Sequence, residues 1–136
     1  SYPHECIGII TTNGKQLFYY PLNNTQNEVH KKEPEKYPWK AEIAYTVDRI
    51  EFDKLIKEVS KQGEKLIAFY HSHPDHEAYF SEIDKEAQTV FGEPEFPDAI
   101  HIVISIRMGI PNNIRCYQWN KNTYDFDEIK TYLFRI

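Results

Sequence analysis

The sequence predicts an α/β fold, and three features of the 136-residue chain support that class. Segments typical of strands alternate with segments typical of helices along the chain. Residues 99–106 are mostly apolar and rich in β-branched side chains, as in a central strand. Residues 48–61 repeat apolar side chains at helical spacing, as in a helix that packs on a sheet. Because there is no internal repeat, linker or low-complexity tract, we expect one domain over residues 1–136.

The first third of the chain predicts a hairpin followed by a long loop. Residues 6–12 are typical of a strand, the Asn-Gly pair at 13–14 of a tight turn that needs positive φ, and residues 16–21 of the partner strand. Residues 22–42 are polar and contain proline, so we expect a loop, and loops of this length are uncommon unless they are functional or mobile. The aromatic run at 37–39 is interpreted either as a packing anchor or as a flap that holds an extended substrate tail against a strand edge.

The clearest helix is expected from Asp48 to about residue 61, followed by a buried strand over residues 65–70. Asp48 can cap the helix, and Gly63 follows its end. A single stripe of apolar side chains faces the core in this prediction. Its members are Phe52, Leu55, Ile56 and Val59.

A second helix is expected over residues 81–90, with its end near Gly92. After the central strand, the two asparagines at 112–113 are expected to turn the chain into a further strand at 114–119. Residues 124–135 fit either a helix or a strand, because the spacing of their apolar and aromatic side chains suits both.

A run of polar side chains between the buried strand and the second helix is the most informative part of the chain. It consists of His71-Ser72-His73, a gap of seven residues, Ser81, two further residues and Asp84. Because side chains alternate along an extended chain, His71 and His73 point the same way and Ser72 points away. Ser81 and Asp84 lie three positions apart and share a helix face. Two imidazoles and one carboxylate are therefore expected to converge, with a hydroxyl beside them.

This convergence is typical of a catalytic zinc site. Nitrogen and oxygen ligands from His71, His73 and Asp84 leave a fourth tetrahedral position for water. A water molecule held there has its pKa lowered to about 7 and becomes a usable nucleophile. Glu5, at the head of the first strand, is suited to general base and then general acid work. Ser81 can donate a hydrogen bond to the developing oxyanion.

Together these residues resemble the JAMM (MPN+, JAB) family of zinc peptidases and isopeptidases. The resemblance implies that His71, His73 and Asp84 bind Zn²⁺ at the end of their strand. It also implies that Glu5, from a neighbouring strand, is the general base and that Ser81 supports the tetrahedral intermediate. The implied substrate is an amide bond after the C-terminal tail of a ubiquitin-like or sulfur-carrier protein. The implied fold is cytidine-deaminase-like, with three α-β-α layers, a mixed and mostly antiparallel sheet, and one helix on each side.

The sequence departs from the family at four points. Ile7 stands where the family commonly has cysteine, with Cys6 one position earlier, and Phe80 stands where proline often precedes the motif serine. The chain opens only four residues ahead of Glu5, so we expect a domain without the helix that usually comes before this segment in the family. The cysteine- and histidine-bearing insertions of eukaryotic polyubiquitin-cleaving members are absent. A compact prokaryotic member is therefore the better analogy.

Each part of the motif also has a purely structural interpretation. Ser81 and Asp84 fit an ordinary helix-capping pattern. Glu5 fits an exposed carboxylate at a strand start, and histidines two positions apart fit the face of a strand. Residues 65–70, however, predict burial, and buried histidines need partners. We therefore favour the metal site.

Composition narrows the classes of function. The net charge is −5 without long runs of one sign, which argues against a nucleic-acid surface. No apolar run approaches the length of a membrane span. Cys6 and Cys116 lack the spacing of metal-binding or redox pairs, and both are expected to be buried. The small number of cysteines favours a reducing, cytoplasmic location. The oligomeric state stays open.

Two other functions compete with the zinc isopeptidase, and a third is remote. Some phage-tail proteins carry similar domains, so one alternative is a phage-tail or cell-wall-associated zinc peptidase. A non-catalytic scaffold, as in family members that have lost the ligands, is disfavoured because every ligand position is intact. A zinc nucleoside deaminase would need a Pro-Cys-x-x-Cys motif, which the sequence lacks.

Overall fold

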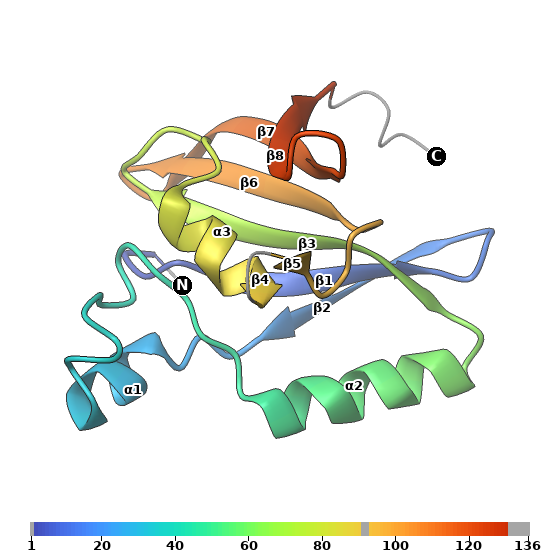
Figure 1. Cartoon of the computed structure of the whole chain (residues 1–136), viewed down its shortest axis with the longest axis horizontal. Coiled ribbons are helices and arrows are strands. Elements are labelled where there is room, and N and C mark those ends of the chain that lie inside the picture. The colour runs from blue at the N-terminus through green and yellow to red at the C-terminus, as the bar shows by residue number, and fades with distance from the viewer. Residues whose placement is uncertain (1, 91–92, 131–136) are drawn as a thin grey trace.

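The computed structural model describes residues 2–90 and 93–130 and has a six-stranded sheet at its centre (Figure 1). The strand order is β2-β1-β3-β6-β7-β8, and only β3 and β6 run parallel to each other. These strands are β1 (Ile7–Thr12), β2 (Leu17–Leu22), β3 (Lys65–Pro74), β6 (Ile100–Arg107), β7 (Ile110–Asn120) and β8 (Asp125–Ile129). The other elements are α1 (Gln26–Lys32), α2 (Arg49–Lys61), α3 (Glu82–Gln88), and a small second sheet of β4 (Thr89–Val90) and β5 (Glu93–Pro94). The predicted α/β class with a mixed, mostly antiparallel sheet is confirmed.

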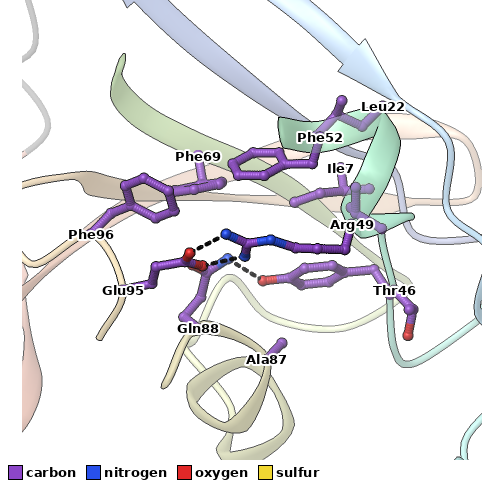
Figure 2. Close-up of a pocket in the computed structure, with 12 residues that line it drawn as sticks. Ile7, Leu22, Thr46, Arg49, Phe52, Phe69, Ala87, Gln88, Glu95 and Phe96 are labelled. Carbon is purple, nitrogen blue, oxygen red and sulfur yellow. Dashed lines mark hydrogen bonds and ion pairs between the residues drawn. The ribbon is translucent and has the colours of Figure 1, made fainter. Parts of the chain in front are cut away.

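Helix α2 forms where the sequence predicts it. The Asp48 side chain accepts hydrogen bonds from two backbone N–H groups of the first turn and caps the helix. Its apolar stripe packs on the sheet, where the rings of Phe52, Phe69 and Phe96 lie 5.4–6.1 Å apart between centroids (Figure 2). Such aromatic packing adds to the burial of apolar surface that holds α2 in place.

In Figure 1, α3 lies in front of the central strands and α2 runs below β1 and β2. Phe52 of α2 packs on Phe69 of β3, and Asp84 of α3 contacts His71 of the same strand. Phe69 and His71 are two positions apart, so their side chains share one face of β3. The expectation of one helix on each side therefore needs correction: these two helices flank one face, because both bury their contacts on the same set of alternating residues.

Residues 22–42 were expected to form a loop, and this expectation is wrong because α1 occupies part of the segment. The helix has an acidic residue in its first turn and basic residues in its last turn, which favours its formation. It ends before Pro34, since proline disfavours helical backbone in the residue that precedes it. The aromatic run is anchored through its backbone: Gln26 donates to the Trp39 carbonyl oxygen, and His30 contacts that of Tyr37.

The expected turn at 112–113 is also wrong, because both asparagines lie inside β7. The chain reverses instead at Met108 and Gly109, which link the paired residues Arg107 and Ile110. Both turn residues have positive φ, 51° and 82°, as the tight turns of two-residue hairpins require. Methionine is an unusual residue for positive φ, whereas asparagine is a common turn residue, so the sequence predicted the turn at the asparagines.

The remaining expectations concern the second half of the chain. The second helix, α3, ends at Gln88, shorter than expected, and β4 follows. Residues 124–135 fitted either a helix or a strand; the structure forms the strand β8 there, and residues 131–135 lie outside the described part.

The two cysteines differ in burial: Cys116 is buried as expected, whereas Cys6 is half-buried. Among the described helices, none is long and apolar enough to cross a membrane.

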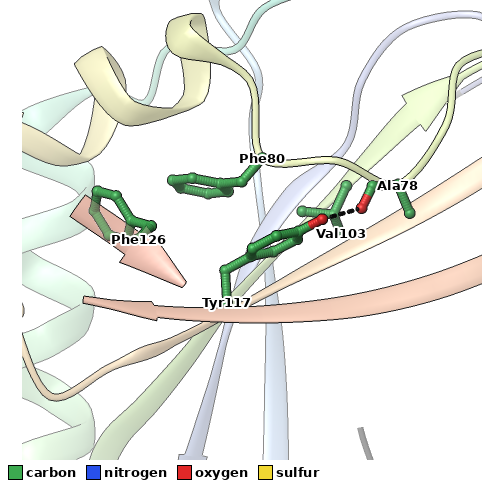
Figure 3. Close-up of a cluster of buried hydrophobic side chains, with 5 residues drawn as sticks. All are labelled: Ala78, Phe80, Val103, Tyr117 and Phe126. Carbon is green, nitrogen blue, oxygen red and sulfur yellow. Dashed lines mark hydrogen bonds between the residues drawn. The ribbon is translucent and has the colours of Figure 1, made fainter. Parts of the chain in front are cut away.

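Phe80, where the family often has proline, belongs to a buried cluster beneath the loop that precedes α3 (Figure 3). Its ring lies 4.7 Å from that of Phe126 and 5.5 Å from that of Tyr117, between centroids. The Tyr117 hydroxyl donates a 2.8 Å hydrogen bond to the Ala78 carbonyl oxygen. Phe80 and Tyr117 therefore hold this loop against β7 and β8.

Phe80→Ala is expected to lower the free energy of unfolding by about 3–5 kcal/mol, because it leaves a cavity in this cluster. Urea denaturation of the variant and the wild type measures the difference. Tyr19→Ala is the matched control: Tyr19 is 72% exposed, and its loss should change stability by less than about 0.5 kcal/mol. Equal effects of the two substitutions would show that the Phe80 cluster does not hold the loop.

Candidate metal centre

The two histidines of the motif share one face of β3, as the sequence predicts. The strand continues through Pro74, so His71 and His73 are both strand residues and their side chains emerge on the same side. Ser72 points away: its Oγ accepts a 2.8 Å hydrogen bond from the Cys6 backbone N–H, and its own N–H donates to the Cys6 carbonyl oxygen at 3.1 Å. These bonds tie β3 to the residue that follows Glu5.

Asp84 reaches the histidines from the first turn of α3. Ser81 is the N-cap of this helix and forms a capping box with Asp84. The Ser81 Oγ accepts from the Asp84 backbone N–H at 3.1 Å, and the Ser81 backbone N–H donates to Asp84 Oδ2 at 2.9 Å. The structural and the functional interpretation of this pair are thus compatible, because the bond that caps α3 also orients the carboxylate toward β3.

Three candidate ligand atoms form a nearly equilateral triangle. The distance between the Nε2 atoms of His71 and His73 is 3.2 Å. Asp84 Oδ2 lies 3.1 Å from the first of these nitrogens and 3.0 Å from the second. His73 Nδ1 is 2.8 Å from the Glu77 carbonyl oxygen, which can only accept a hydrogen bond. The Nδ1 of His73 therefore carries a proton, which leaves Nε2 free to bind a metal ion.

Glu5 completes the cluster from the segment just before β1. Its side chain is 2% exposed, and one oxygen of each of Glu5 and Asp84 lies within 4.8 Å of the histidine nitrogens. The Glu5 backbone N–H donates to the Ala41 carbonyl oxygen at 2.7 Å. All four residues that the sequence proposes around the metal are therefore brought together and buried.

Two carboxylate oxygens in the cluster, Glu5 Oε1 and Asp84 Oδ1, are buried and have no hydrogen-bond partner among the described residues. Leaving such groups unpaired is costly, so buried orphans point to a missing partner. A metal ion suits this position, since the donor set consists of two imidazole nitrogens and two carboxylates. The residues present thus fit a bound metal ion.

Burial and mutual contacts shift the pKa values of the groups in the cluster. Burial alone would raise the pKa of the Asp84 carboxyl, yet the adjacent His71 and His73 imidazoles hold it well below its usual range. Burial lowers the pKa of His73, but its hydrogen bond to Asp84 and the charge of Asp84 outweigh that effect and raise it. Burial, with repulsion by Asp84, raises the pKa of Glu5 to about 9. A cation among these groups would lower the pKa of Glu5 by favouring the carboxylate.

In the metal-free protein, Glu5 is expected to reduce stability as the pH rises between about 4.5 and 9. Over this range the folded state keeps a proton that the unfolded chain releases, so stability falls with rising pH, by up to about 1.4 kcal/mol per pH unit. Glu5→Gln cannot ionise and should lack this loss. Urea denaturation in a chelator at pH 5, 7 and 8.5 tests it, and an identical pH dependence of the two proteins would contradict it.

Asn24 is a structural residue of the site that the sequence interpretation missed. Its Nδ2 donates to the carbonyl oxygens of Glu5 and Ala44 at 2.9 and 3.1 Å. Its Oδ1 accepts from the backbone N–H groups of Gln26 and Thr46 at 3.0 and 3.1 Å. One side chain thus joins the Glu5 backbone to α1 and to residues 44–46. Only the bond from Gln26 is local, whereas Glu5, Ala44 and Thr46 lie 19–22 residues away in the sequence, so no local pattern indicates that Asn24 holds the Glu5 backbone.

Tyr45 is a second residue that the sequence interpretation missed. Its ring centroid lies 5.2 Å from that of His71, and its side chain is buried. Its hydroxyl accepts a 2.7 Å hydrogen bond from Gln88 Nε2, one helical turn after Asp84. Burial raises the pKa of the Tyr45 hydroxyl, so this group stays neutral. Tyr45 therefore connects the segment before α2 with both β3 and α3.

Known proteins resemble this chain in sequence family and in fold. The family described as prokaryotic homologs of the JAB domain matches residues 1–119. A protein of Desulfitobacterium hafniense, with a structure determined in solution, superposes with a TM-score of 0.63 and 21% identity, covering 95% of this chain and 77% of that chain. A Salinibacter ruber protein gives 0.55 and 23%, with the same coverage. At these identities the likeness concerns the fold. No curated protein matches the chain.

Proposed function

Because this chain belongs to the family of prokaryotic JAB-domain homologues, we propose that it is a zinc-dependent peptidase or isopeptidase. The predicted resemblance to the JAMM (MPN+, JAB) family is confirmed, and the buried cluster of Glu5, His71, His73 and Asp84 carries the proposal. The proposed reaction is hydrolysis of the amide bond that follows the C-terminal tail of a ubiquitin-like or sulfur-carrier protein.

The distances among the candidate ligands support zinc. Protein ligands about 2.0–2.2 Å from a tetrahedral zinc ion lie about 3.3–3.5 Å from one another. The three separations among His71 Nε2, His73 Nε2 and Asp84 Oδ2 are 3.0–3.2 Å, so a slight expansion admits the ion. Three ligands of this kind are typical of catalytic zinc sites, whereas structural sites use four.

Glu5 is proposed to move the proton. When bound, zinc would polarise the substrate carbonyl and acidify a water molecule, which is the chemistry that it supplies in such sites. Glu5 accepts a proton from the attacking water through its side-chain carboxylate and delivers it to the departing amine nitrogen. Its orphaned Oε1 is free for this proton, and its backbone is held by Ala41 and Asn24.

Ser81 is proposed to stabilise the oxyanion. Its Oγ accepts from the Asp84 N–H, which leaves the hydroxyl proton free to donate. The residue is half-buried at the N-terminus of α3, beside Asp84. A hydrogen bond aimed at charge that develops during the reaction stabilises the transition state.

The burial of the cluster supports a slender substrate. Its four residues are at most 3% exposed, so the surface of a folded domain cannot present a bond to them. A flexible, extended tail is thin enough to reach the site, as in the ends of ubiquitin-like proteins. The half-exposed Trp39 belongs to the aromatic run at 37–39, for which a flap over such a tail is one of the two interpretations, beside a packing anchor.

Cleavage of fusion proteins tests this function. Prokaryotic ubiquitin-like and sulfur-carrier proteins, each joined through its C-terminal tail to a reporter, are incubated with the zinc-loaded chain and analysed by mass spectrometry. The expected result is a cut directly after the tail, lost on chelation and restored by zinc. The same fusions with the tail deleted are the control. A zinc-loaded protein that cleaves no fusion in the panel would contradict the proposed substrate class.

A further inference from the structure

A pocket of about 260 Å³ lies between α2, α3 and the segment that follows β5 (Figure 2). None of the four metal-centre residues lines it, so it is a separate cavity. Small-molecule and cofactor sites usually have volumes of about 300–1,000 Å³. The volume of this pocket is below that range and suits a single large side chain better than a cofactor.

One wall of the pocket is aromatic. Phe52, Phe69 and Phe96 contribute the ring cluster that anchors α2, and these rings are labelled together in Figure 2. Tyr45 and Ala87 also line the pocket. An apolar ligand that displaces water from such a wall gains free energy in proportion to the area it buries.

The pocket and the metal centre share a wall. Tyr45 lines the pocket and also packs against His71. Ile7, another lining residue, is the direct strand partner of His71. Phe69 precedes His71 by two residues on β3, which places their backbones about 7 Å apart. The pocket therefore lies within the length of a few extended residues of the metal centre.

Charges at the rim of the pocket satisfy one another. The Arg49 guanidinium forms a two-point ion pair with Glu95, with one N–O distance of 2.6 Å. Arg49 also contacts Asp53 at 3.0 Å. None of the lining residues in the described part of the chain therefore offers an unpaired positive charge to an acidic ligand, which favours an uncharged, apolar occupant.

We propose that this pocket is a specificity subsite that receives one large apolar side chain, leucine or aromatic, from the extended tail of the substrate. The proposal rests on the function proposed above and deepens it. Because an extended chain advances about 3.3 Å per residue, the bound side chain belongs to a residue about two to four positions from the bond that is cut.

Binding of blocked amino acids tests the subsite without requiring turnover. N-acetyl-leucine amide and N-acetyl-phenylalanine amide are titrated into the isotope-labelled full chain, with and without added zinc, and followed by NMR. The expected result is saturable shifts at Ile7, Val47 and Phe69, which line the pocket. N-acetyl-glutamate amide is the charged control and should bind at least about tenfold more weakly. No shifts at these residues with either apolar probe would overturn the proposal.

Ala87→Trp and Glu86→Trp form a matched pair of variants. Both positions are exposed on α3, but only Ala87 lines the pocket. Ala87→Trp should fill the pocket and weaken binding of the apolar probes by about tenfold or more, whereas Glu86→Trp should leave it unchanged. Ala87→Leu fills less space and is the second variant if tryptophan disturbs folding. Unchanged binding to folded Ala87→Trp or Ala87→Leu would overturn the subsite.

The two proposals fail in different ways. If the chain cleaves none of the fusions but binds leucine amide in the pocket, the proposed substrate class fails and the apolar subsite stands as a binding site. If it cleaves a fusion, Ala87→Trp should lower kcat/KM with an unchanged zinc content, and a wild-type kcat/KM would overturn the subsite alone.

Discussion

Asp84→Ala is expected to abolish both metal binding and hydrolysis. The substitution removes one of three candidate ligands, and the Oδ2 atom that it deletes lies 3.0–3.1 Å from both histidine nitrogens. Loss of an outer partner of a metal ligand costs about 10–100-fold in affinity, so loss of the ligand itself should cost more than about 100-fold. Elemental mass spectrometry gives the zinc content per chain, and isothermal titration gives the affinity.

Two controls separate metal binding from folding. Asp84 also accepts the Ser81 backbone N–H, so alanine removes a helix cap as well as a ligand. Asp84→Asn keeps a hydrogen-bond acceptor of the same size and should fold normally while still losing zinc. Glu86→Ala, at an exposed position of the same helix, should retain both zinc and activity. A full equivalent of tightly bound zinc in folded Asp84→Ala would remove Asp84 from the ligand set.

Glu5→Gln is expected to keep zinc but to lower kcat by about 10²–10⁴-fold, the usual contribution of a general acid–base group. Glutamine preserves the shape of the side chain, and the three-ligand set of His71, His73 and Asp84 stays intact. It cannot accept a proton from water at neutral pH, so the proton transfer to the leaving amine is lost. Single-turnover cleavage of the best fusion, with zinc content measured on the same sample, provides the test.

Glu42→Gln is the matched control for this substitution. Glu42 is a nearby carboxylate that pairs with His4 on the surface, 3.3 Å from its Nε2. Exposed pairs of this kind contribute little, so its turnover should equal that of the wild type. Normal turnover in zinc-loaded Glu5→Gln would contradict the assignment of Glu5 as the general base. Loss of zinc from Glu5→Gln would instead make Glu5 a fourth ligand.

The ligand triad could be predicted because it depends on local geometry. Alternation in β3 places His71 and His73 on one face, and the helical spacing of Ser81 and Asp84 orients the carboxylate. Both relations act over three or fewer residues and survive in the folded chain. Glu5 is 66 residues from His71, and its place was inferred from the family pattern.

The errors in the predicted fold arise where the local preference of the sequence for a helix, strand or turn is weak, or where tertiary contacts override it. The short helix α1 was not predicted, because the prolines and asparagines around it are typical of loops and turns. At the hairpin between β6 and β7, pairing of Arg107 with Ile110 imposes positive φ on Met108, against the usual preference for asparagine or glycine. The side on which α2 and α3 pack depends on their connections to the sheet, which the periodicity of a helix does not encode.

The sequence by itself determined the α/β class, the capped helix α2, and the identity and spacing of the three candidate ligands. Only the tertiary structure decided that Glu5 is buried with an orphaned oxygen, that Asn24 holds its backbone, and that Tyr45 separates the metal centre from an apolar pocket. The reason is physical: local spacing sets where a side chain points along its own strand or helix. Burial, desolvation and shared walls depend instead on segments that are far apart in the chain and meet only when it folds.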